Sequence, residues 1–145
     1  MKELFLLLRE RLMEIPGIAW VDLNKGQINI NQFDTRPSID FPAVLLNISY
    51  PRTKKLSRLE QQCEVLVEVT IVFDFMDDTD SITPDVILEE SLEVYDTVEL
   101  VHRKLQGLMD VEVIRSPLQR TGVRDVQRSD RLKTFVAIYA TNQIQ

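Results

Sequence analysis

The chain has 145 residues, 44% of them hydrophobic and 28% charged, so it is long enough to bury a core without disulfides or metals. Its net charge of −6 excludes a general attraction to nucleic acid or to anionic membranes. Its one cysteine, Cys63, excludes an internal disulfide and fits a reducing compartment. The apolar run near the N-terminus is short and interrupted by charges, which does not predict a signal peptide. No run of about 18 apolar residues predicts a membrane span.

The first predicted element is a helix over residues 2–14, because leucines recur at steps of four from Leu4 to Leu12. The Pro-Gly pair at 16–17 is expected to end it. Two short strands are predicted next, at residues 18–23 and 27–30. The Asn-Lys-Gly sequence between these strands supplies turn residues and predicts a hairpin, and residues 31–40 are expected to form a loop.

A further strand is predicted at residues 41–49. Pro42 belongs at its start or on a sheet edge, because proline cannot donate to a ladder. The basic residues 51–57, followed by Arg58, are expected to connect this strand to the next. Two interpretations are open for this connection: a solvated turn, or an arm that orders against a partner.

The longest predicted strand covers residues 61–76. Apolar side chains occupy every second position from Val65 to Phe75, so one face of the strand should lie on the core. The other face is mixed and is expected to turn polar toward Asp74. A strand of about fourteen residues exceeds the usual length of about five or six, which allows part of it to extend beyond the sheet.

A second helix is predicted at residues 84–106, with Thr83 as N-cap and Gly107 as the C-terminal stop. Its carboxylates come first and its basic residues last, an order that complements the helix dipole. The outer face is strongly acidic and is either a solvated face or a charged docking surface. The predicted apolar stripe consists of Leu88, Leu92, Tyr95, Val98, Val101 and Leu105, and it is widened by Ile87 and Val94.

The last quarter of the chain is predicted to form a hairpin of residues 117–124 and 132–139, after a weak short strand at 111–114. This quarter is locally basic but lacks interleaved aromatic residues for stacking on bases. Contacts with the carboxylates of an acidic neighbour are therefore favoured over contacts with phosphate. Together the elements predict a single α+β domain over residues 1–145, with a mixed or antiparallel sheet of about five strands packed against two main helices.

No sequence motif predicts catalysis, a metal or a cofactor. The acidic cluster with most appeal for a divalent cation is Asp74, Asp77, Asp78 and Asp80, but no glycine supplies the tight turn of a calcium loop. The sole histidine, His102, has no base or nucleophile beside it in sequence. Cys63 fits a small buried residue better than a nucleophile. The chain also lacks a Gly-rich phosphate loop and paired Cys or His residues for zinc.

Charges of opposite sign are separated along the chain. The helix is acidic over residues 85–99, whereas residues 52–58 and 115–133 are basic. Opposite patches on one subunit suit a head-to-tail interface, which closes into a ring when the rotation permits. The candidate interface residues are Arg52, Lys54, Lys55, Glu89, Glu93, Asp96, Arg124 and Arg128.

The order of these elements resembles the tail terminator (tail completion) proteins of long-tailed bacteriophages. The resemblance rests on the sequence DFPAV at residues 40–44, on EVLVEVTIVF at 64–73 followed by the acidic helix, and on the closing strand RLKTFVAIYA at 131–140. It covers most of the chain in order and length, and its motifs are structural rather than catalytic.

The resemblance implies a ring of identical subunits, typically a hexamer, at the head-proximal end of the tail tube. Such a ring stops tube polymerisation and offers a surface to the head-side connector protein, with room for DNA to pass through. The sheet would form the ring wall and the helices would pack on it. The implied location is the virion of a phage or prophage, after assembly in the bacterial cytoplasm, without membrane contact or sequence-specific binding of nucleic acid.

Three other hypotheses stay open. The first is a different head–tail joining or neck adaptor of similar build. The second is a small metal-dependent phage nuclease that uses the Asp74–Asp80 cluster. The third is a ligand-binding regulatory domain, which requires a pocket.

Overall fold

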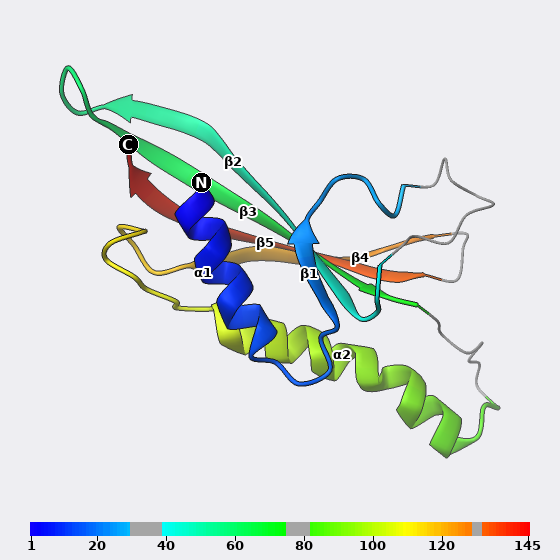
Figure 1. Cartoon of the computed structure of the whole chain (residues 1–145). Coiled ribbons are helices and arrows are strands. Elements are labelled where there is room, and N and C mark those ends of the chain that lie inside the picture. Colours follow the sequence, from blue (N-terminus) through cyan, green and yellow to red (C-terminus); the bar gives the residue numbers. More distant parts are fainter. Residues whose placement is uncertain (30–38, 75–81, 129–131) are drawn as a thin grey trace.

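The computed structural model describes residues 1–29, 39–74, 82–128 and 132–145. Within these ranges the chain forms two helices and a five-stranded mixed sheet, which confirms the predicted α+β class (Figure 1). The elements in chain order are α1 (Lys2–Met13), β1 (Trp20–Leu23), β2 (Ala43–Lys55), β3 (Gln61–Phe73), α2 (Asp85–Leu105), β4 (Gln119–Val126) and β5 (Lys133–Ile144).

The sheet has the strand order β1-β2-β3-β5-β4, in which β1 and β2 are parallel and the other pairs antiparallel. Strand β3 pairs with β2 from Gln61 to Val72 and with β5 from Gln62 to Phe73. No described part of β3 extends beyond the sheet, because β2 or β5 accompanies it over its whole length from Gln61 to Phe73.

Both helices lie on one face of the sheet (Figure 1). The buried leucines of α1 and the C-terminal part of α2, ending at Leu105, pack on the alternate residues of β3 from Val65 to Phe73. The predicted apolar face of β3 is therefore confirmed over the described residues. We call this face of the sheet the helix face and the opposite one the reverse face.

The reverse face carries a smaller core at the Asp74 end of β3, where Val72 packs with Ile28, Ala43 and Leu45. The prediction that this face turns polar toward Asp74 was therefore wrong. The polarity runs the other way, with Glu64 and Glu68 half-exposed and Thr70 buried. The reason is that Ile28 and Ile39, which come before β2 in the chain, pack over this end.

The segment between α1 and β2 also differs from its prediction. Instead of forming a hairpin with residues 27–30, β1 pairs in parallel with β2. Residues 24–29 form a turn in which the Gln27 amide donates to the Leu23 carbonyl (2.9 Å) and Gly26 has a φ of +80°. The Leu23 carbonyl at the end of β1 is thus bonded by the side chain of Gln27 and not by a second hairpin strand. Residues 30–38, with most of the predicted loop, lie outside the described residues.

The second helix begins one residue later than predicted, with Pro84 rather than Thr83 at the N-cap, and ends before Gly107 (φ +75°). Its buried side is rotated from the centre of the predicted stripe, because Ser91 is buried whereas Leu92 and Tyr95 are exposed. The predicted apolar surface was correct at Val94, Val101 and Leu105, which lie in the main core.

The terminal hairpin of β4 and β5 is confirmed, and β5 continues to Ile144. The weak strand predicted at 111–114 is instead a turn. Its backbone N–H groups at Val113 and Ile114 both donate to the Asp110 carbonyl (2.9 and 2.8 Å), and the Ile114 side chain is fully buried.

Candidate interaction surfaces

The segment predicted as a basic connection is the far part of the β2–β3 hairpin. Strand β2 runs to Lys55, and the turn follows at residues 56–60. We call residues 51–60 the basic arm, because they carry Arg52, Lys54, Lys55 and Arg58. In Figure 1 this arm is the end of the sheet that reaches beyond the helices.

A bulge decides where the basic side chains of the arm point. Ser49 pairs with Leu66 but Arg52 pairs with Glu64, so Tyr50 and Pro51 together oppose Val65. Proline cannot donate to a ladder and is tolerated at such a bulge. The extra residue shifts the alternation of side chains, so Arg52 and Lys54 lie on the reverse face.

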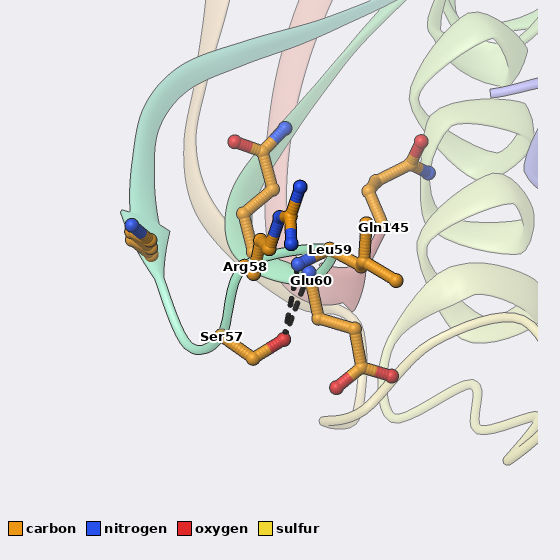
Figure 2. Close-up of a pocket in the computed structure, with 7 residues that line it drawn as sticks. Ser57, Arg58, Leu59, Glu60 and Gln145 are labelled. Carbon is orange, nitrogen blue, oxygen red and sulfur yellow. Dashed lines mark hydrogen bonds between the residues drawn. The ribbon is translucent and has the colours of Figure 1, made fainter.

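The tip of the arm is held by local hydrogen bonds (Figure 2). The Glu60 carbonyl accepts from the N–H groups of Leu56 (3.0 Å) and Ser57 (3.1 Å), and the Ser57 hydroxyl accepts from those of Leu59 (3.3 Å) and Glu60 (3.1 Å). Leu59 is nonetheless 87% exposed. A shallow hollow of about 390 Å³ beside the tip is lined by Lys55, Ser57, Arg58, Leu59, Glu60, Gln61 and Gln145.

The opposite charge lies on the outer side of α2. Residues 89, 92, 93, 96 and 100 follow one another at helical spacing and share a face directed away from the buried Val94 and Val101. We call this set, Glu89, Leu92, Glu93, Asp96 and Leu100, the acidic helix face. All five side chains are exposed. Within the described part of the chain, no cation forms an ion pair with its three carboxylates.

The basic arm and the acidic helix face lie far apart in one subunit. The arm is at one end of the sheet, and the N-terminal half of α2 reaches toward the other end (Figure 1). The two also face in opposite directions, since α2 covers the helix face whereas Arg52 and Lys54 lie on the reverse face. The predicted interface residues are therefore not brought together within one chain.

The two remaining candidates lie on and just after the edge strand β4. Arg124 is exposed and pairs with Val136, so its side chain lies on the reverse face. Arg128 is half-buried and donates to the backbone carbonyl of Ile28 (2.6 Å). Arg128 is thus engaged inside its own subunit, one hundred positions away in sequence.

The structure also assembles a polar cluster that the sequence did not indicate. His102 Nδ1 lies 3.1 Å from the buried hydroxyl of Tyr139, and Arg120 lies across the β4–β5 ladder from that tyrosine. Burial raises the pKa of Tyr139 to about 12, so its hydroxyl stays protonated. Burial and, secondly, the charge of Arg120 lower the pKa of His102. A hydrogen bond between the neutral imidazole and this hydroxyl therefore ties α2 to the sheet.

The remaining chemical candidates are Cys63 and the acidic cluster that begins at Asp74. Cys63 is free and fully buried, as expected for a packing residue. Of the acidic cluster only Asp74 lies in the described ranges, while Asp77, Asp78 and Asp80 fall outside them. Elsewhere in those ranges no group of three or more potential metal ligands converges.

Neither a scan against protein-family models nor a search of curated proteins found a match. Among the described helices, none has the length and apolar character needed to cross a membrane.

Proposed function

We propose that this chain is the subunit of a ring that caps a phage tail tube, ends its polymerisation and joins the tail to the head. The observation that carries the proposal is the placement of the basic arm and the acidic helix face at opposite ends and on opposite faces of one subunit. Such charges do not meet within one copy, whereas they can meet between successive copies. A contact of this head-to-tail kind repeats from copy to copy and closes when the rotation permits.

The fold supports the same proposal. Two helices cover one face of a sheet with three long central strands, and much of the reverse face, including Asn47, Ser49 and Glu68, is left uncovered by helices. A layered subunit of this kind can line up with its neighbours as one segment of a wall. The order of elements also agrees with the order on which the resemblance to tail terminators rests, except that the single strand β1 stands in place of the expected hairpin.

The proposed mechanism is binding without bond chemistry. Complementary charges guide the approach of two copies and fix their register, while packing at the centre of the contact supplies the affinity. The partners are further copies of this chain, the tail tube protein and the head-side connector. The proposed location is the head-proximal end of the tail in the virion, after assembly in the host cytoplasm.

Capping of tail tubes tests this function. Tube protein from the same phage or prophage would be polymerised with increasing amounts of this chain, and tube lengths would be measured by electron microscopy. We expect shorter tubes at amounts far below one copy per tube subunit, with a ring at one end of each tube. Unchanged lengths and bare tube ends would contradict the proposal. Binding to the connector but not to tubes would favour a different neck adaptor.

A further inference from the structure

We infer that the contact between successive subunits is made by the basic arm of one copy lying across the acidic helix face of the next. In this contact Arg52 and Lys54 face Glu89 and Glu93, and Leu59 packs against Leu100. The inference rests on the proposed function, because it names the partner surface by which the ring assembles.

Apolar side chains distinguish the acidic helix face from an ordinary solvated surface. Leu92 and Leu100 are 45% and 41% exposed, and they lie within the same row as the three carboxylates. The tip of the arm presents the matching combination, with the exposed Leu56 and Leu59 beside basic residues. Apolar contacts surrounded by charged residues are the usual composition of a specific protein interface.

The spacing of the charges also matches. Arg52 and Lys54 are two residues apart on one face of a strand, which separates them by about 6.6 Å. Glu89 and Glu93 are four residues apart on a helix, which separates them by about 6 Å along the axis. Two ion pairs therefore fit side by side when the arm lies along the helix. The segment 85–99 has six carboxylates and no Lys or Arg, and the segment 52–58 has four basic residues and no acid.

The orientation of the two surfaces favours a repeated contact over a symmetric pair. Since Arg52 and Lys54 lie on the reverse face and α2 lies on the helix face, a second copy that uses its arm leaves its own helix free for a third. The positive charge of the arm is partly offset by Glu64, which lies opposite Arg52 on the neighbouring strand β3. The arm contact does not require Arg128, whose side chain is hydrogen-bonded to the Ile28 carbonyl of its own subunit.

Compensating charge reversals test this contact directly. An arm variant carries Arg52→Glu and Lys54→Glu, a helix variant carries Glu89→Lys and Glu93→Lys, and a combined variant carries all four. Assembly would be followed by light scattering against concentration, under conditions in which the wild-type chain assembles, and folding by circular dichroism. We expect the arm and helix variants each to need at least about tenfold more protein for half-assembly, because like charges then face each other.

Recovery is the deciding readout. The combined variant should assemble alone, and an equal mixture of the arm and helix variants should co-assemble, since each basic surface again meets an acidic one. The mixture must alternate and therefore closes only rings with an even number of subunits. Folded single-surface variants that assemble like the wild type, or a folded combined variant that does not recover, would overturn the contact.

Two further variants test whether the contact is specific to the arm. Arg124→Glu also reverses an exposed cation of the reverse face, outside the arm, and should change half-assembly by less than about twofold. Leu59→Ser should weaken assembly without loss of folding, because this side chain is exposed in the subunit.

A wild-type chain that stays monomeric even with tail tubes would contradict the proposed function and the contact with it. If the wild-type chain caps tail tubes and the arm and helix variants cap them equally well, the contact is contradicted but the proposed function is not.

Discussion

The hydroxyl of Tyr50 lies 2.5 Å from Oε1 of Gln143 and so joins β2 to β5 across the intervening strand β3. The same hydroxyl accepts from the amino group of Met1 (3.1 Å) and from the side-chain amide of Gln145 (3.1 Å). Gln143 is buried, and its amide donates to the Val113 carbonyl (2.9 Å). One tyrosine oxygen therefore organises the base of the arm.

We expect Tyr50→Phe to lower the free energy of unfolding by about 1–3 kcal/mol, because the buried Gln143 oxygen loses its donor. Urea unfolding followed by fluorescence measures the change. The matched control is Tyr95→Phe, whose ring is half-exposed and keeps its edge contact with Phe135. The control should change stability by less than about 0.5 kcal/mol. Equal effects of the two substitutions would contradict this role of Tyr50.

The two sides of α1 should differ sharply in their contribution to stability. Leu8→Ala leaves a cavity in the main core and should cost about 2–5 kcal/mol, as for other buried leucines. Leu6 is on the opposite side of the same helix and is 51% exposed, so Leu6→Ala should cost less than about 0.5 kcal/mol. Denaturation midpoints measure both. A large cost for Leu6→Ala in the isolated subunit would mean that α1 is packed differently.

Acidification should destabilise the fold through His102. Its pKa is lower in the folded chain than in the unfolded chain, so the unfolded state binds more protons between the two values. Stability therefore falls as the pH drops below about 6.5 toward the folded-state pKa, and this contribution is constant above that window. Protonated Nδ1 would also lose its ability to accept from Tyr139.

The pH prediction is checked with thermal unfolding of the wild type and of His102→Gln between pH 5 and 8. The variant should show a flatter dependence over the lower part of this range. Proton nuclear magnetic resonance of the ring would locate the folded-state pKa directly. A titration at or above the ordinary histidine value would contradict the burial of this imidazole.

Gly107 should be more sensitive to substitution than Gly122. Both have open space where a Cβ would lie, but only Gly107 has a positive φ (+75°). Gly107→Ala should therefore cost about 1–2 kcal/mol through backbone strain alone, whereas Gly122→Ala should be close to neutral. The comparison by urea unfolding isolates the backbone effect, and similar costs at both sites would argue against a left-handed helix end at Gly107.

The elements with the strongest hydrophobic period were the ones predictable from sequence. The alternation from Val65 to Phe73 and the leucines of α1 each bury one face in a single main core, so pattern and structure agree. The basic end of β2 was missed, because residues such as Lys54 and Lys55 have low strand propensity. Their strand is imposed by pairing with Gln62 and Gln61 in the neighbouring β3.

The parallel partner of β1 was missed for a related reason. Local turn residues at 24–26 indicate that the chain turns, but they do not identify the strand that β1 then meets, which lies about twenty residues further on.

The candidate surfaces were partly predictable. Charge separation along the chain identified the acidic helix and the basic segment before β3, and both are exposed as the prediction requires. The direction of Arg52 depends on the bulge at Tyr50 and Pro51, and the engagement of Arg128 depends on a distant carbonyl of Ile28. Neither follows from local sequence, because each is set by long-range pairing.

The most direct test of ring formation is the solution mass of the intact chain. Light scattering would be recorded over a wide concentration range, with and without magnesium, and in the presence and absence of soluble tail tube protein. We expect a discrete ring, a hexamer by the resemblance, whose population grows with concentration or on addition of the tube protein. A chain that remains a monomer at every concentration, with and without the tube protein, would contradict ring formation.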